Sequence, residues 1–153
     1  MHVYRICLTK YADDLFASGR RARWNYQDRF VIYTAASRAL ACLENVVHRG
    51  GEGLNDQFSV LVIDIPDDLL IEEITLAQLP PDWEKASRYA VCQPLGEAWY
   101  AARRAAVLRV PSSIVPQEFN YILNARHPEF RRVQIVGREG FRFDARIKAA
   151  ENS

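Results

Sequence analysis

Residues 30–48 read FVIYTAASRALACLENVVH, and this stretch joins two elements of different periodicity. Residues 30–34 form a β-branched and aromatic run, which predicts a buried strand. Between residues 36 and 48 the apolar side chains recur at helical spacing, and the glycines Gly50 and Gly51 that follow predict the end of a helix. A strand that leads directly into an amphipathic helix indicates a fold that mixes both kinds of element.

The rest of the chain adds short elements on both sides of this stretch. Strands are expected at residues 3–8, 58–65, 69–76 and 106–110, a helix at residues 94–103 with Pro94 in its first turn, and a hairpin of residues 133–136 and 141–145 around Gly137 and Gly140. Strands and helices interleave without regular βαβ periodicity. We therefore expect one α+β domain and not a doubly wound sheet.

Composition and charge exclude several classes of protein. The 153 residues are 49% hydrophobic and carry 20 basic against 19 acidic side chains, a balance that disfavours direct nucleic-acid binding. Three dispersed cysteines and three dispersed histidines predict neither a disulfide framework nor a metal site. The sequence shows no secretory signal and no apolar run of membrane-spanning length, so we expect a cytoplasmic protein.

Glu44 is the most informative single residue of the predicted helix. At 100° per residue it lies about 40° from Leu40 and about 60° from Val47, at the edge of the apolar stripe. A carboxylate in that position is half buried and needs an arginine or hydroxyl partner, or a cleft to face. The alternative is a glutamate whose carboxylate reaches solvent.

The loop of residues 19–26 reads GRRARWNY, three arginines and two aromatic residues. Guanidinium groups suit phosphate and aromatic rings suit a flat base, so the loop could hold a nucleotide. The alternative is a solvated basic loop in which Trp24 fills the core. Tyr33 is open to a core or a site role, and Ser112 to a turn or a ligand role. Neither a G-x-S-x-G elbow nor a G-x-G-x-x-G fingerprint is present.

Five blocks of the sequence resemble the RES-domain toxins, a family named for its Arg, Glu and Ser residues. The blocks are YRI at 4–6, ARWN at 22–25, VIYTAASRALACLENVVH at 31–48, CQPLGEAW at 92–99 and VPSSIVPQEFNYILNARHPEF at 110–130. They cover nearly the whole chain, so residues 1–153 are read as one RES domain. The chain departs from the family around Arg23, where Ala22 and the run after Asn25 replace the usual glycines.

The resemblance implies a fold similar to the ADP-ribosyltransferase and diphtheria-toxin core, a split sheet whose cleft holds NAD+. It makes Arg23, Tyr33, Glu44 and Ser112 the catalytic set, and it assigns NAD+ binding to Arg5, Arg23, Tyr33 and Ser112. NAD+ is then the substrate, with no separate cofactor and no metal.

The resemblance also implies the biological setting. Such toxins deplete NAD+ by hydrolysis or phosphorolysis, or in some cases ADP-ribosylate a protein, and they are paired with an Xre-type antitoxin that blocks the cleft. A homodimer within the toxin–antitoxin complex is a further expectation. Two alternatives stay open: a toxin that acts on RNA, suggested by the Arg-rich loop, and an inactive RES-like module that only binds the antitoxin.

Overall fold

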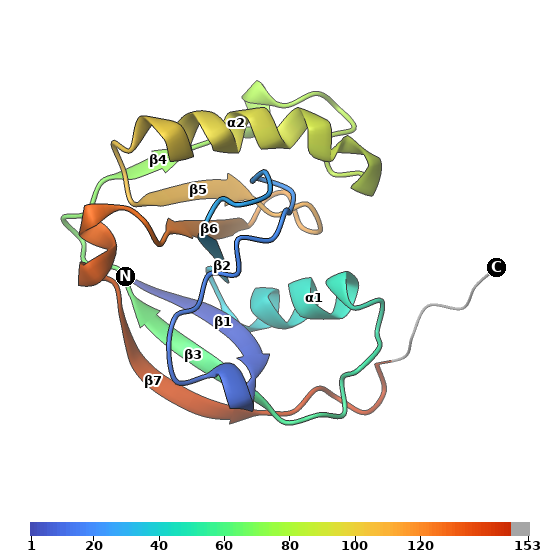
Figure 1. Cartoon of the computed structure of the whole chain (residues 1–153). Helices are drawn as coiled ribbons and strands as arrows, with labels where there is room; N and C mark the ends of the chain where they lie inside the picture. Colours follow the sequence, from blue (N-terminus) through green and yellow to red (C-terminus); the bar gives the residue numbers. More distant parts are fainter. Residues whose placement is uncertain (148–153) are drawn as a thin grey trace.

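The strand and helix expected in residues 30–48 form as neighbours in a computed structural model that describes residues 1–147 (Figure 1). The strands are β1 (His2–Leu8), β2 (Val31–Ala35), β3 (Phe58–Asp64), β4 (Ile71–Glu73), β5 (Val107–Pro111), β6 (Phe119–Asn124) and β7 (Gln134–Phe141). The helices are α1 (Arg38–His48) and α2 (Tyr89–Ala102), and short 3₁₀ turns η1 (Thr9–Tyr11), η2 (Leu76–Gln78), η3 (Ala86–Arg88) and η4 (Pro128–Arg132) connect them. The expected α+β class is confirmed.

The strands form one mixed sheet in the order β4-β5-β6-β2-β1-β3-β7. All neighbours are antiparallel except β4 and β5, which run parallel. β1 pairs with β3 along its whole length, but with β2 only at Tyr4 and Ala35. The sheet therefore divides between β1 and β2 into two halves, as expected for a split sheet.

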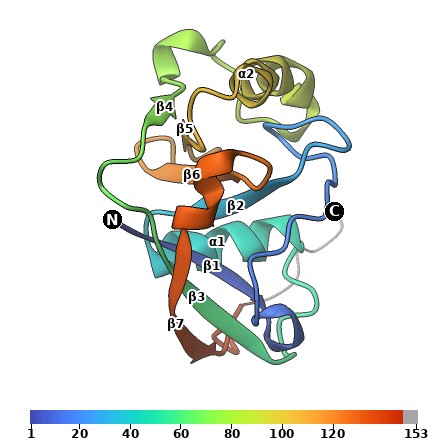
Figure 2. The ribbon, with the colours of Figure 1, turned by 60° about the vertical axis from the view of Figure 1, so that its left-hand side comes forward.

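Both helices cover the same face of this sheet, one over each half (Figures 1 and 2). Val31, Tyr33 and Ala35 alternate along β2 and so share a face. Val31 and Tyr33 pack in the cluster of α2 with Trp99, whereas Ala35 packs in the cluster of α1 with Leu40. The two helices therefore pack on neighbouring parts of β2, α2 at its start and α1 at its end. Neither helix in residues 1–147 is long and apolar enough to cross a membrane.

The opposite face carries the largest cluster of buried aliphatic side chains. Leu61, Ile63 and Leu123 are almost fully buried there. Leu15, from the segment that precedes β2, and Phe130, from η4, pack against them. Because this cluster spans both halves of the sheet, it ties β1 to β6 where backbone pairing across the split is sparse.

Helix α1 begins and ends for identifiable reasons. Ser37 is the N-cap, and its hydroxyl accepts a hydrogen bond of 3.1 Å from the Leu40 amide. Gly50 and Gly51 both take positive φ after the helix, which few other residues do without strain. The predicted helix is confirmed, beginning at residue 38. Its side chains Leu43 and Val47 are exposed, so the apolar stripe is narrower than expected.

The expectations for the C-terminal third were wrong in two places. The residues around Gly137 and Gly140 form no hairpin: β7 is one continuous strand that pairs with β3, and neither glycine has a positive φ. No element was expected at residues 119–124, which form β6, because asparagines at 120 and 124 weaken the strand signal.

Two other boundaries also differ from expectation. α2 begins at Tyr89, so Pro94 lies inside the helix and not in its first turn. Burial of Cys92 and Trp99 against the sheet outweighs the unfavourable proline, which costs about 3 kcal/mol in a helix interior. The strand expected at residues 69–76 is limited to Ile71–Glu73, because Leu76 already begins η2.

Candidate functional site

Glu44 projects from α1 towards β5 and β6, and it is half buried as its position on the helix predicted. Its Oε1 accepts hydrogen bonds from the Ser112 hydroxyl at 2.8 Å and from the Asn120 amide nitrogen at 2.7 Å. Both donors bind the same oxygen, and Oε2 accepts no hydrogen bond from any residue between 1 and 147. The carboxylate is thus anchored on one side and available on the other.

Ser112 takes the turn role, one of the two that the sequence left open. It is 0% exposed, and its oxygen accepts hydrogen bonds from the Ile114 and Val115 amides, each at 3.1 Å. These bonds shape the turn after β5, while the hydroxyl proton goes to Glu44. The hydroxyl is thus committed to the turn and to Glu44, and a role of Ser112 towards a ligand stays a prediction.

Asn120 is a site residue that sequence reasoning missed. It lies at the start of β6 and pairs with Ala35 of β2. Its Oδ1 is buried without a hydrogen-bond partner in residues 1–147, while its Nδ2 holds Glu44. The alternation of Phe119, Asn120 and Tyr121 carries the signal that could have found it, since it turns the amide to the helix side of the sheet.

Tyr33 lies on the same face of the sheet as Asn120. Tyr33 pairs with Ile122 and Ala35 pairs with Asn120, so Tyr33 and Asn120 are diagonal neighbours, roughly 7–8 Å apart. The Tyr33 hydroxyl donates to Asn25 Oδ1 at 2.6 Å and accepts from the Trp24 amide at 3.0 Å. Burial raises the pKa of the Tyr33 phenol above its ordinary value, which keeps the group neutral.

Arg23 holds its loop to the segment that precedes α2. Its guanidinium donates to the carbonyl oxygens of Trp83, Glu84 and Lys85 at 2.7, 3.0 and 3.3 Å. It also lies over the Tyr89 ring, 4.8 Å from the centroid. The contact of Arg23 with a phosphate stays a prediction, because most of its donors bind backbone here.

The rest of the Arg-rich loop divides between core and solvent. Trp24 is buried, as the structural alternative for this loop expected, and Asn25 is buried beside it. Arg20 and Arg21 are exposed. The loop therefore packs against α2 through its aromatic residue and leaves two cations at its rim.

Arg5 occupies the split between the two half-sheets. Its Nη1 donates to the Tyr33 carbonyl oxygen at 3.0 Å, and no carboxylate among residues 1–147 forms an ion pair with it. Burial lowers the pKa of Arg5, although an arginine remains protonated in proteins. A half-buried cation without a counterion favours a bound anion.

The structure thus places the predicted residues in two adjoining groups. Glu44 and Ser112 are in direct contact, with Asn120 as their third member. Arg5 and Arg23 both lie near Tyr33. Arg5 donates to the Tyr33 carbonyl oxygen, and Arg23 belongs to the loop whose Trp24 amide donates to the Tyr33 hydroxyl. The split sheet agrees with the ADP-ribosyltransferase-like core that the sequence resemblance implies.

Comparison with known proteins narrows this class to a family. The RES domain model matches residues 2–145. The chain belongs to the RES-domain toxin family.

Three relatives illustrate the similarity. The Prs ADP-ribosylating toxin of Sphingobium sp. (strain YBL2) is 36% identical over 144 residues, 91% of this chain and 89% of its own length. The Toxin Res of Photorhabdus laumondii is 34% identical over 157 residues, 99% of each chain. The Toxin Res of Yersinia enterocolitica is 32% identical over 156 residues, 97% of this chain and 100% of its own length.

Proposed function

We propose that this chain is an enzyme that cleaves the bond between nicotinamide and ribose in the NAD+ of the cytoplasm. The observation that carries the proposal is the anchoring of Glu44 through Oε1 alone, which leaves Oε2 for a substrate. Cleavage of an N-glycosidic bond passes through an oxocarbenium-like state, and a fixed carboxylate stabilises the positive charge that develops on the ribose. Ser112 and Asn120 hold that carboxylate in place before the substrate arrives.

The other residues would bind the dinucleotide. Arg5, with no counterion of its own, suits the pyrophosphate. The neutral Tyr33 phenol is proposed to lie at the nicotinamide end, where its ring can stack. Arg23 holds its loop against the segment that precedes α2, and we propose that it also contacts the second phosphate of the NAD+ pyrophosphate.

The reaction balances with NAD+ and one acceptor molecule as its only reactants. The bond between ribose C1′ and the nicotinamide nitrogen breaks, and its electron pair leaves with nicotinamide, which departs neutral. Water, phosphate or a protein nucleophile forms the new bond to C1′ and loses its proton. Because the leaving group is neutral, positioning and electrostatic stabilisation supply most of the rate.

The acceptor distinguishes two versions of the proposal. We favour hydrolysis or phosphorolysis, and transfer to a protein is the second candidate because one relative is named as an ADP-ribosylating toxin. The test incubates purified protein with NAD+, with and without phosphate, and identifies the products. A hydrolase is expected to release nicotinamide and ADP-ribose in both samples. A phosphorylase is expected to release nicotinamide, with a phosphate ester of ADP-ribose, only where phosphate is present. RNA cleavage without nicotinamide release would contradict the proposal.

We further propose an Xre-type antitoxin as the partner that covers this site. Leu43 and Val47 are exposed on α1 beside Glu44, which suits an apolar contact. Arg5 and the loop arginines would attract an acidic segment as readily as a pyrophosphate. NAD+ binding to the toxin alone should therefore be stronger than to the toxin–antitoxin complex, and equal affinities would refute occlusion.

A further inference from the structure

A cavity lies at the far end of β6 from the Glu44 group. It has a volume of about 300 Å³ and is lined by the end of α2, by the residues just before β2 and by the end of β6. Asn120 is the second residue of β6 and Asn124 the last, so about four residues, roughly 13 Å of strand, separate the two places. The proposed NAD+ chemistry uses none of the residues of this cavity.

Three arginines give the cavity an excess of positive charge. Arg29 is neutralised by Glu97, with Nε 2.8 Å from Oε2. Arg103 and Arg126 line the same cavity, and neither forms an ion pair with a carboxylate in residues 1–147. Asp28 is the second carboxylate at the rim. Three guanidinium groups thus face two carboxylates.

The two unpaired arginines are held in place by other contacts. The Arg126 guanidinium lies over the Phe30 ring, 4.3 Å from its centroid. Arg103 Nη2 donates to the Arg126 carbonyl oxygen at 3.0 Å, and His127 Nε2 lies 2.9 Å from the Arg103 carbonyl oxygen. Side chains fixed in this way lose less conformational entropy when a ligand binds.

Asn124 adds an amide donor to this cluster. It is 2% exposed, yet it lines the cavity. Its Oδ1 accepts from the Arg126 amide at 2.9 Å, and its Nδ2 donates to no group in the described part of the chain. Nδ2 is not among the buried side-chain atoms of residues 1–147 that lack a partner, so it reaches the solvent of the cavity and can donate to an acceptor that a ligand would bring.

The backbone around the cavity is unusual as well. Asp28 has a φ of 62° and Arg103 a φ of 57°, and within residues 1–147 no other residue apart from glycine has a positive φ. Both line the cavity. Arg103 is the C-cap of α2, where a left-handed residue commonly ends a helix, and aspartate tolerates this region, so both conformations shape the wall of the cavity.

We propose that this cavity binds the phosphate group of a small molecule. Arg103, Arg126 and the Asn124 amide would donate to its oxygens, the donor set that phosphate prefers. A volume of about 300 Å³ is at the lower limit of small-ligand pockets, enough for a phosphate and a short attached group. The Asp28 amide donates to the Gly19 carbonyl oxygen at 2.7 Å and so closes the loop that contains Arg23. A ligand in the cavity would connect this end of the loop to the end of α2.

The test follows the side-chain amide resonance of Asn124 by NMR while the whole protein is titrated separately with inorganic phosphate and with glycerol 3-phosphate. Saturable shifts of this resonance are expected. Tighter binding of inorganic phosphate would identify free phosphate as the ligand, and tighter binding of glycerol 3-phosphate would identify a phosphate ester. Arg126→Gln and Arg103→Gln should each weaken binding at least about tenfold, since each removes a charge-assisted hydrogen bond.

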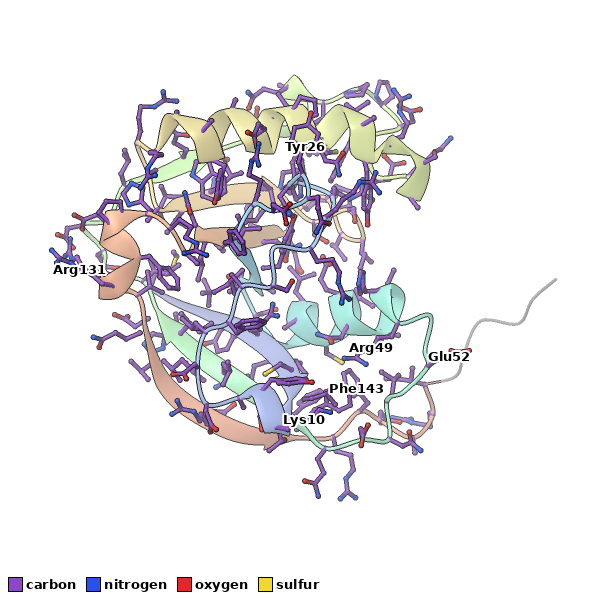
Figure 3. The ribbon with its side chains drawn as sticks, in the orientation of Figure 1. Lys10, Tyr26, Arg49, Glu52, Arg131 and Phe143 are labelled. Atoms are coloured by element: carbon purple, nitrogen blue, oxygen red, sulfur yellow. The ribbon has the colours of Figure 1, made fainter. Side chains whose placement is uncertain are left out.

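Arg131→Gln is the matched control, because Arg131 is an exposed arginine on η4 (Figure 3) that does not line the cavity. It should leave the affinity unchanged. An Asn124 amide that does not respond to either compound would overturn the proposal, and so would equal weakening in the Arg131 and Arg126 variants. Because the readout is local and needs no turnover, it stands even if NAD+ cleavage fails its own test.

Discussion

Gly96 marks the point where α2 meets the backbone of the Arg23 loop, and we predict that Gly96→Ala destabilises the protein. A Cβ at this position would lie 1.7 Å from the carbonyl oxygen and 2.8 Å from the carbonyl carbon of Trp24. Contacts of a Cβ shorter than 3.0 Å essentially do not occur. Either the helix or the loop must therefore move.

Neither partner of this contact can move cheaply. The Trp24 amide donates to the Tyr33 hydroxyl, and Gln93 donates to the carbonyl oxygens of Ala22 and Asn25. Overpacking costs about 1–3 kcal/mol, and each hydrogen bond lost adds about 1 kcal/mol. Alanine regains about 1 kcal/mol of helix propensity. We expect a net loss of about 2–3 kcal/mol in the free energy of unfolding.

Thermal unfolding measures this loss. In a domain of this size 1 kcal/mol corresponds to about 2–4 °C, so Gly96→Ala should lower the Tm by about 4–12 °C. Gly140→Ala is the control, because a Cβ there meets nothing within 4 Å, and it should leave stability equal or raise it by about 0.4–1 kcal/mol. A Gly96→Ala protein as stable as the parent would refute the close approach of α2 to the loop.

Three further substitutions test the site. Arg5→Met keeps the apolar stem and removes the charge, so NAD+ binding measured by calorimetry should weaken by about 1.5–3 kcal/mol, and an unchanged affinity would exclude the phosphate contact. Arg23→Ala should lower both the Tm and the NAD+ affinity, because the guanidinium holds three backbone carbonyls; weaker binding at an unchanged Tm would argue against that holding role. Ser112→Ala removes one donor to Glu44 and should lower kcat about tenfold with little change in KM, whereas an unchanged kcat would contradict the positioning of Glu44.

The sequence predicted the elements that local pattern determines. Residues 58–65 are nearly all apolar and contain the interior strand β3, and the residues at helical spacing after β2 form α1. The half-buried position of Glu44 followed from its angle on that helix. These features depend on periodicity within one element, which the sequence displays directly.

The features that sequence reasoning missed depend on contacts between distant residues. β6 carries two asparagines, and its strand form is secured by pairing with β2 on one side and β5 on the other. Gly137 and Gly140 suggested a turn, but pairing with β3 keeps them extended. The hydrogen bond between Asn120 and Glu44 joins residues 76 positions apart, so alternation along β6 can give the face on which Asn120 lies but not its partner.

The most direct test of the central claim is the rate of nicotinamide release from NAD+ by Glu44→Gln. Glutamine keeps the shape of the side chain and removes the charge that is proposed to stabilise the ribosyl cation. Glu52→Gln is the matched control, an exposed glutamate in the loop after α1 (Figure 3). The account predicts that Glu44→Gln keeps the parent fold by circular dichroism but releases no nicotinamide, while Glu52→Gln releases it at the parent rate. Full nicotinamide release by a folded Glu44→Gln protein would contradict the account.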